Sequence, residues 1–483
     1  MPITAPAVQL AALLPALALM AAGGLVLILD LLPPRQSKDH LGEVAVAGVL
    51  ASMIANIALW GSDVRAFGDM VVLDGYALFL DIVIGYAVGL VLLLSGDYLR
   101  RAGAASGEYY ALVLFSGSGM MLLASASDLI IVFLSLELMS LCLYVLAGLF
   151  KTRLAAGEAS MKYFLLGAFA TSFLLYGIAL VYGASGTTNF NRIATAMANR
   201  SHEALFVVGI ALILVGFGFK ISSVPFHMWA PDVYEGAPTS VTALIATGSK
   251  AAAFAALMRL LLTALGGSRG DWSVLLWALA VLTMTVGNVV AIAQANLKRM
   301  LAYSSIAHVG YMMVGLVAGG PSGAGAVLFY LFAYTFTTVG TFGVIALCER
   351  AGQEAVKVED YAGLSRRSPL LAATLSLFLL SLVGIPPLAG FVGKFYLFGA
   401  AVRSGYLWLT VIAVLNSAVA AYYYLRVIVY MYMREADGAA AGYAPSLAGA
   451  LALGIALVGI TVLGIVPAPF VDLAQAAVAP LLR

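Results

Sequence analysis

Six ionisable side chains lie deep inside apolar stretches of this 483-residue sequence, where charge is rare. They are Glu137, Lys162, Lys220, Lys250, His308 and Lys394. At the centre of a hydrocarbon layer, a charged side chain costs about 2.5–3.5 kcal/mol on insertion scales. The carboxylate and the four amines would together cost about 12–17 kcal/mol, comparable with the stability of a whole domain. Such a set needs a function or a compensating partner, and it indicates an ion pathway.

The chemistry of these side chains suits proton movement. Removal from water lowers the pKa of an amine from about 10.4 toward neutrality, and a nearby carboxylate restores the charged form. A change in the separation of Glu137 and Lys220 would therefore load or release a proton. A neutral imidazole can pass protons in either direction, so His308 could join Lys250 to Lys394 through water.

Structural roles remain open for several of these residues. Lys162 lies near one end of its apolar stretch and could extend its amine to the membrane interface. Glu137 and Lys220 could form a static buried ion pair that orders the helices. His308 could simply be hydrogen-bonded within the core. Lys250 is too far from both ends of its stretch to reach the interface, and a purely structural role stays open for it and for Lys394.

The composition places the chain in a membrane. Hydrophobic residues make up 63% of it and charged residues 10%, whereas soluble proteins carry about 25% charge. The mean hydropathy is +1.02, and the net charge of +2 offers no basic surface for nucleic acid. Cys142 and Cys348 lie far apart in apolar runs, and the four histidines are scattered. We therefore expect no metal or redox cofactor in this chain.

Apolar runs long enough to cross about 30 Å of hydrocarbon predict an all-α, polytopic fold with fourteen spans. The spans lie near residues 7–32, 42–61, 73–95, 108–126, 128–150, 158–184, 204–229, 238–265, 272–295, 299–319, 323–348, 369–402, 405–433 and 446–468. The first run is too long for a signal peptide and follows no Lys or Arg, so we predict that it is retained.

Two of these spans should be broken. In GFGFKISSVPFHMWAPDVYEGAP, residues 216–238, a buried lysine is followed by Pro225, which removes a backbone hydrogen bond. We predict that a loop follows the break and that His227 and Asp232 in this loop have structural roles. This loop would hold His227, Trp229, Asp232 and Tyr234. The run 369–402 is too long for one span, and Gly384, Pro386, Pro387 and Gly390 interrupt it before GFVGK, which echoes GFGFK.

The two broken spans are five spans apart, which predicts two five-helix repeats of opposite orientation. The segments would be an N-terminal three-helix unit (1–107), the first repeat (108–265), the second repeat (266–433) and a C-terminal helix (434–483). Odd-numbered connections hold thirteen Lys and Arg, whereas the even ones and the C-terminus hold six. This bias predicts cytoplasmic odd connections and two periplasmic termini.

Several charges near predicted span ends are left out of the pathway. We expect Arg259 and Arg426 to extend to the membrane interface. Four aspartates also lie near predicted span ends and are not expected in the pathway: Asp30, Asp74, Asp81 and Asp128.

Two strings, HMWAPDVYEGAPTSVTALIATGSKAAAF at 227–254 and LKRMLAYSSIAHVGYMM at 297–313, resemble a known family. The family is that of the antiporter-like, proton-conducting membrane subunits of respiratory complex I and of multisubunit cation/proton antiporters. The resemblance covers about residues 108–433. Within the family, the sequence is most similar to the subunit N group of bacterial NADH:quinone oxidoreductases, because Lys394 is a lysine and no long lateral helix follows the last span.

The resemblance implies fourteen helices with two inverted repeats, and roles for the residues that match its motifs. The matches are Glu137 in the fifth helix, Lys162 in the sixth, Lys220 in the broken seventh, Lys250 in the eighth, His308 in the tenth and Lys394 in the broken twelfth. The implied activity is proton translocation from cytoplasm to periplasm, driven by NADH-to-quinone electron transfer in other subunits of a bacterial inner-membrane complex. The chain would not be catalytic alone. FMN, iron–sulfur clusters and quinone would lie in other subunits, and the implied partners are antiporter-like subunit M and small subunits K and J.

Other functions share these residues. A subunit of a multisubunit sodium/proton antiporter or of a membrane-bound hydrogenase fits nearly all of them. Co-purification with NADH dehydrogenase activity would separate the first from a complex I subunit. A polyprenyl-phosphate glycosyltransferase would need acidic metal-binding loops outside the lipid, and the sequence has no such cluster.

Overall fold

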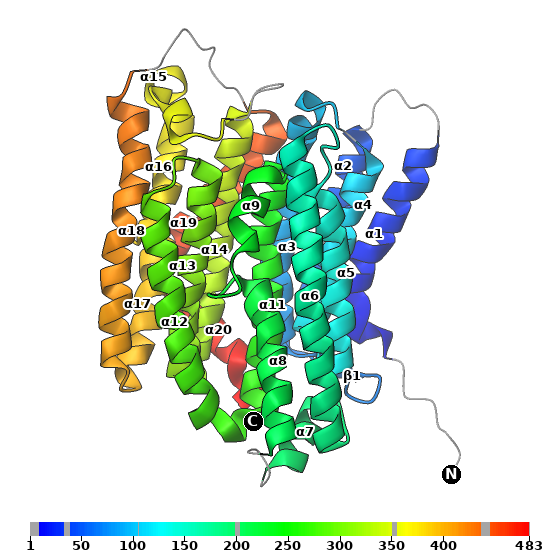
Figure 1. Cartoon of the computed structure of the whole chain (residues 1–483). Coiled ribbons are helices and arrows are strands. Elements are labelled where there is room, and N and C mark those ends of the chain that lie inside the picture. Colours follow the sequence, from blue (N-terminus) through cyan, green and yellow to red (C-terminus); the bar gives the residue numbers. More distant parts are fainter. Residues whose placement is uncertain are drawn as a thin grey trace.

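The computed structural model describes residues 9–32, 39–104, 106–198, 203–349, 355–435 and 445–482, and it is a bundle of long, roughly parallel helices (Figure 1). Twelve helices in these ranges are long and apolar enough to cross a membrane. The prediction of an all-α membrane fold is therefore confirmed. Five basic residues that entered the predicted orientation lie outside the described residues, namely Arg35, Lys38, Arg200, Arg350 and Arg483.

Eleven of these candidate spans contain one α-helix each. They are α1 (Leu14–Leu31), α2 (Asp39–Ala58), α3 (Gly75–Arg101), α5 (Leu129–Ala147), α6 (Leu154–Ser185), α8 (Ala204–Ile221), α12 (Arg269–Ile292), α13 (Leu297–Ala318), α14 (Gly320–Cys348), α18 (Leu407–Met433) and α19 (Leu447–Ile465). The remaining span, Thr239–Ala264, is a composite of four segments. These are α10 (Thr239–Leu244), a π-helical turn (Ile245–Ser249), α11 (Lys250–Arg259) and a second π-helical turn (Leu260–Ala264).

Three further helices correspond to the fourth and twelfth predicted spans. Helix α4 (Gly107–Ala124) has 18 residues, the same length as α8. Helices α16 (Pro369–Val383) and α17 (Ala389–Arg403) have 15 residues each, so neither crosses the membrane alone. Each predicted span thus has a helical counterpart, while the total of fourteen crossings stays a prediction.

The sequence did not predict six short strands and α-helices. They are the antiparallel hairpin β1 (Val64–Ala66) and β2 (Val71–Leu73), α7 (Phe190–Met197), α9 (Trp229–Gly236), α15 (Leu364–Arg367) and α20 (Ala468–Val478). The expected loop after the first break was wrong, because Trp229, Asp232 and Tyr234 belong to α9. Pro231 falls in the first turn of α9, where the missing N–H would have no helical partner in any case.

The two broken helices run in opposite directions. Helix α8 ends at Ile221, where Ser222 takes the left-handed conformation (φ 64°), and the chain continues into α9 near the end of the bundle that carries α15 (Figure 1). Helix α16 begins at that end, stops at Gly384 (φ 91°) and leads into α17 toward the opposite end. Opposite directions are what inverted repeats require. The repeat boundaries themselves stay predictions.

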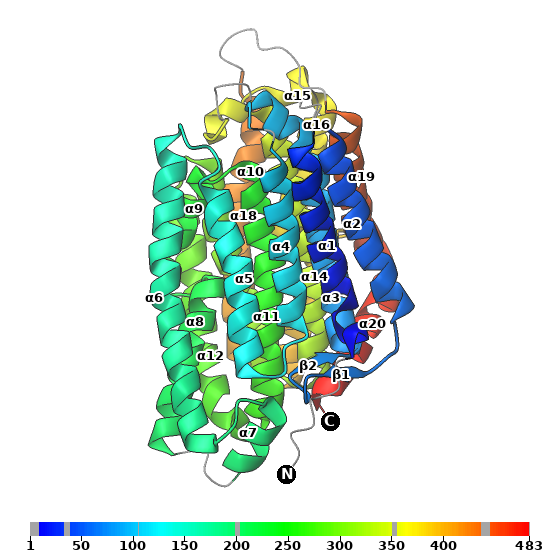
Figure 2. The same cartoon turned by 90° about the vertical axis from the view of Figure 1, so that its right-hand side faces the viewer.

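The described ends of the chain lie at one end of the bundle. The start of α1, the β1–β2 hairpin, α7 and α20 lie at the end opposite α15 (Figures 1 and 2). At the α15 end, Arg101 donates hydrogen bonds to carbonyls of Ala346, Leu347 and Glu349. This arrangement agrees with an even number of crossings. Which end faces the cytoplasm stays a prediction.

The expectation that Arg259 extends to the membrane interface was wrong, and the structure shows the surroundings of two other charges near predicted span ends. Arg259 is buried and pairs with Asp74 at 2.8 Å, because the segment that carries it is enclosed by protein on every side. Arg426 donates to the carbonyls of Ile292 (2.9 Å) and Gln294 (2.5 Å), at the C-terminal end of α12, where a cation is stabilised. Asp81 is buried within α3.

Candidate functional site

A row of buried polar side chains runs through the core, and Lys250 lies in it. Lys250 follows a π-helical turn, a feature often found at functional sites, and its Nζ donates to Ser305 Oγ on α13. Ser305 Oγ also accepts from Tyr334 Oη at 2.8 Å and lies 3.3 Å from Tyr234 Oη. The ammonium is 5.9 Å from the centroid of the Tyr234 ring. Hydroxyl groups and an aromatic ring thus surround Lys250.

His308 lies one turn beyond Ser305 on α13 and continues the row. Its Nδ1 is 2.6 Å from Tyr330 Oη, and its Nε2 is 3.1 Å from Tyr424 Oη. A neutral imidazole donates from one nitrogen and accepts at the other, so this ring can pass a proton between two hydroxyls. The Tyr334 ring lies 5.2 Å from the His308 ring, and the Tyr311 ring lies 5.6 Å from the His308 ring and 4.9 Å from the Lys394 ammonium. Tyrosine side chains therefore connect the imidazole to the surroundings of both amines.

Lys394 is held by the end of the broken helix that precedes it. Its Nζ donates to the carbonyls of Leu382 (2.9 Å) and Val383 (2.8 Å) and to Ser417 Oγ (2.8 Å). The two carbonyls belong to the last residues of α16, at the negative end of that helix. The ring of Tyr311 lies 4.9 Å from the ammonium. The break between α16 and α17 thus supplies the acceptors that a buried cation needs.

Lys394 also borders a groove that reaches the outer surface. The groove has a volume of about 530 Å³ and runs between α17 and α18. Phe395, on its wall, is 64% exposed. Lys394 is therefore the member of the row nearest to the exterior of the chain on this side.

Lys220 occupies a more apolar environment at the end of α8. Its Nζ lies 3.4 Å from Tyr144 Oη and 5.1, 5.4 and 5.8 Å from the ring centroids of Tyr144, Tyr163 and Phe219. The Glu137 carboxylate interacts with it electrostatically, yet Glu137 Oε1 is buried and has no hydrogen-bond partner in the described structure. The two groups are therefore near each other without forming the static ion pair that was one alternative.

Other polar atoms around Lys220 are also buried without a partner among the described residues. They include Ser222 Oγ, directly after α8, and Tyr163 Oη. Buried polar atoms are normally satisfied by protein or by ordered water. We therefore expect water to link Lys220 to its neighbours other than Tyr144, whereas several hydroxyl groups gather directly around Lys250.

Lys162 lies apart from this row. Its side chain is 41% exposed and pairs with Glu158 (2.6 Å) and Asp232 (2.7 Å). Arg299 binds the same aspartate at 2.6 Å and Glu235 at 2.8 Å, so the network ties α6, α9 and α13 together. Burial alone would raise the pKa of Asp232, but hydrogen bonds from Lys162 and Arg299 outweigh it and hold the pKa below its usual range. The network is thus charged at neutral pH and fixes α9 after the break.

Sequence reasoning missed the hydroxyl groups that connect the charges. Serine and tyrosine are common residue types in apolar helices, so neither type by itself indicates a functional site. The residues concerned are Ser305, Tyr330, Tyr334 and Tyr424. The spacing of Ser305 and His308, one helical turn apart, was the available clue, because it places both on one face of α13.

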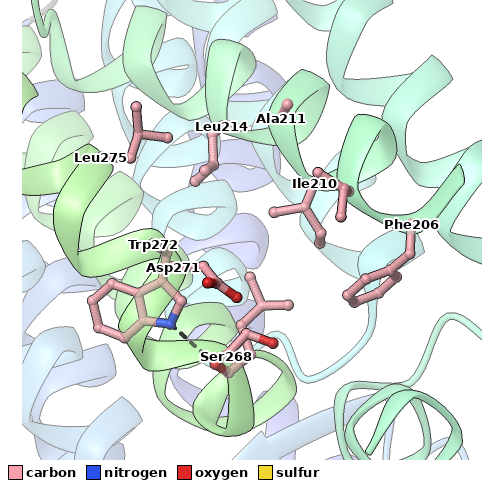
Figure 3. Close-up of a pocket in the computed structure, with 10 residues that line it drawn as sticks. Phe206, Ile210, Ala211, Leu214, Ser268, Asp271, Trp272 and Leu275 are labelled. Carbon is pink, nitrogen blue, oxygen red and sulfur yellow. Dashed lines mark hydrogen bonds between the residues drawn. The ribbon is translucent and has the colours of Figure 1, made fainter. Parts of the chain in front are cut away.

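The described residues contain no group of three or more His, Cys, Asp or Glu side chains that could hold a metal ion. A separate pocket of about 200 Å³ lies between α8 and α12, away from the buried row (Figure 3). Its lining is mostly apolar, with Ser268 and Asp271 at one side, and Trp272 Nε1 donates to Leu265 O at 3.0 Å. It contains none of the predicted site residues.

Comparisons with known proteins agree on one family. Residues 126–420 match the family model described as "NADH:quinone oxidoreductase/Mrp antiporter, TM". The chain is 48% identical to NADH-quinone oxidoreductase subunit N of Trichlorobacter lovleyi over 98% of its own length and 97% of the relative. It is 36% identical to a chain of respiratory complex I from Thermus thermophilus, with a TM-score of 0.81 over 95% of this chain and 99% of the other. A chain of the Mrp complex from Dietzia has a TM-score of 0.85 at 22% identity, covering 98% and 97% of the two chains, and so shares the fold.

Proposed function

The chain belongs to the family of NADH:quinone oxidoreductase and Mrp antiporter membrane subunits, and from this premise we propose that it moves protons across the membrane as subunit N of a NADH:quinone oxidoreductase. One observation carries the proposal: a row of buried contacts in which tyrosine side chains link the charged groups. Lys250 binds Ser305, Tyr334 contacts both Ser305 and the His308 ring, and the Tyr311 ring lies between His308 and Lys394. A stable fold does not require three buried amines, since each of them costs free energy in lipid.

The steps use only side chains of this chain and water. A proton would enter from the cytoplasm at Lys220 and pass to the neutral amine of Lys250, and the ammonium that results would donate to Ser305. His308 would relay it to Lys394, and the groove beside Lys394 would release it. The approach of Glu137 to Lys220 would favour the charged amine, and its retreat would favour release. Each step is a proton exchange without electron transfer.

The free energy needed to move a proton across the membrane is similar in size to the interaction energy of Glu137 with Lys220. Moving one charge against 100 mV costs about 2.3 kcal/mol. Two unit charges 4 Å apart interact by about 4 kcal/mol at an effective dielectric constant of about 20. A displacement of Glu137 relative to Lys220 therefore changes the free energy enough to drive a proton uphill.

Electron transfer would occur in other subunits. In this proposal FMN, iron–sulfur clusters and quinone are bound elsewhere in the complex, and this chain has no catalysis of its own. Subunits M, K and J are the proposed neighbours in the bacterial inner membrane, with both termini in the periplasm. Partly exposed apolar helices on the surface support burial against other membrane subunits or lipid.

Replacing Lys220 with methionine, or Glu137 with glutamine, tests the function. Each change keeps the side-chain size and removes one member of the proposed switch, so we expect proton translocation to fall by more than about tenfold. The measurement is proton uptake by proteoliposomes that contain the purified complex, with NADH oxidation followed in parallel. Lys151→Met, at an exposed position, is the control. Undiminished translocation by an assembled Lys220→Met complex would reject the proposal.

Gly393 has a specific role in the proposed relay. A Cβ at this position would overlap the Tyr330 ring, whose hydroxyl contacts His308 Nδ1. We expect Gly393→Ala to displace Tyr330, at a cost of about 1–3 kcal/mol, and to slow proton translocation. Gly399→Ala, on the same helix, is the matched control, because its Cβ would lie 3.5 Å from the flexible Arg403 side chain. Equal translocation by the two variants would remove Tyr330 from the relay.

A further inference from the structure

A buried carboxyl group lies outside the row of lysines, in the N-terminal helices. Asp81 on α3 is 2% exposed, and its Oδ1 has no hydrogen-bond partner in the described structure. Asn56 on α2 is 0% exposed, and neither its Oδ1 nor its Nδ2 has a partner there. Leaving such groups unsatisfied costs several kcal/mol in apolar surroundings. Two of them on neighbouring helices indicate a shared polar site.

The packing of α2 against α3 places the two side chains at the same level. A Cβ on Gly89 would lie 3.4 Å from Val49, and a Cβ on Gly85 would meet Met53. The two helices are therefore antiparallel, and a step of four residues toward the C-terminus of α2 matches a step of four residues toward the N-terminus of α3. The next step brings the turn that contains Asn56 beside Asp81.

Both side chains face the protein interior and not the lipid. The outer face of α2 is formed by Leu50, Ile54 and Ile57, all of them exposed. Ser52, one turn before Asn56, donates to Pro15 O on α1 at 2.8 Å and lies 3.5 Å from the sulfur of Met121 on α4. The face of α2 that carries Asn56 is thus enclosed by α1, α3 and α4.

The surrounding charges favour a neutral Asp81. The charged groups that interact with it are Asp74, two turns earlier on the same face of α3 and about 10 Å away, and Arg259 from α11. Arg259 is already neutralised, because it binds both oxygens of Asp74 at 2.8 and 2.9 Å. An ionised Asp81 would therefore add an uncompensated negative charge to a buried site, whereas the protonated acid would not.

We propose that Asp81 and Asn56 form a second proton-binding site, a carboxyl–carboxamide pair joined directly or through one water, which exchanges its proton during turnover. The inference rests on the proton-moving function proposed above. The acid O–H would donate to Asn56 Oδ1, and Asn56 Nδ2 would donate to water or to Asp81 Oδ1. When the proton leaves to water, the carboxylate remains and no electron moves. The site lies between α2 and α3, whereas Lys220, Lys250 and Lys394 belong to α8, α11 and α17.

Infrared difference spectroscopy of the purified complex, with and without NADH, tests this site. A protonated carboxyl group has a carbonyl band that moves in D₂O and disappears on ionisation. We expect that band to be lost in Asp81→Asn and to move in Asn56→Leu, where the carboxyl group loses its partner. Asp63→Asn, at a half-exposed carboxylate paired with Arg65, should leave the band unchanged. A wild-type band that survives Asp81→Asn would overturn the proposal.

If the variants fail to assemble, the wild-type complex can be tested instead, with its aspartate residues labelled with ¹³C at the carboxyl group. The band of the wild-type complex should then move with labelled aspartate and stay in place with labelled glutamate. A carboxyl signal that depends on Na⁺ instead of D₂O would show a cation site and overturn the proton site. Loss of pumping in Lys220→Met without any Asp81 band would reject this site alone. Normal pumping in Lys220→Met together with an Asp81 band that responds to NADH would reject the proposed function and support this site.

Discussion

Replacing Lys250 with methionine is expected to lower proton translocation by more than about tenfold while the complex still assembles. Lys250 is buried at the start of α11, and its ammonium is the group that donates to Ser305. Methionine fills similar space but carries no exchangeable proton, and Ser305 would still bind Tyr334. The measurement is the initial rate of proton uptake by proteoliposomes, compared at equal amounts of assembled complex.

Lys162→Met separates the buried row from the peripheral ion-pair network. Lys162 is partly exposed and shares Asp232 with Arg299, so its loss still leaves α9 bound to Arg299. We expect this variant to retain most of its proton translocation. Normal translocation by Lys250→Met, or a complete loss in Lys162→Met alone, would contradict the assignment of the pathway to the buried row.

Replacing Arg259 with methionine should destabilise the protein by about 3–5 kcal/mol. Burial alone would raise the pKa of Asp74, but the charge and hydrogen bonds of Arg259 outweigh it and keep the pKa below its usual value. Asp74 is therefore ionised at neutral pH, and loss of Arg259 leaves a buried charge without a partner. The midpoint of thermal unfolding and the yield of assembled complex measure the effect.

Two comparisons give this experiment its controls. Arg366→Met removes a 3.4 Å ion pair with Glu435 in which both side chains are exposed, so little change is expected. The double variant Asp74→Leu/Arg259→Met should be more stable than Arg259→Met alone, because it removes both charges. A fall in stability that is equal for Arg259→Met and Arg366→Met would show that burial does not set the cost.

The buried amines could be predicted because their cost in lipid belongs to the residue type and needs no knowledge of the fold. Lys220, Lys250 and Lys394 are all buried, as their positions within long apolar runs indicated. The breaks beside Pro225 and Gly384 could be predicted for a similar reason, since proline and glycine change the backbone locally.

Partners distant in the sequence could not be predicted. Asp74 and Arg259 are 185 residues apart, and nothing in either local sequence indicates the pair. Arg259 was therefore expected at the membrane interface. The hydroxyls of Tyr330 and Tyr424 converge on His308 from α14 and α18, and only the packing of those helices brings them together.

The sequence also left open which side chains point into the protein and which point outward. Helices in lipid show little amphipathic periodicity, because both their inner and outer faces are apolar. The sequence therefore left open whether Lys162, which is partly exposed, belongs with Lys220, which is buried. For the same reason it could not show that Asp81 points into the interior of the N-terminal helices.

The most direct measurement is the position of ordered water in an experimental structure of the intact complex. Our account predicts water molecules that join Glu137 Oε1, Lys220 and Tyr163 Oη and continue to Lys250, where the described residues leave buried polar atoms without protein partners. Tightly packed apolar side chains in that space, with the three buried amines isolated from one another, would contradict it.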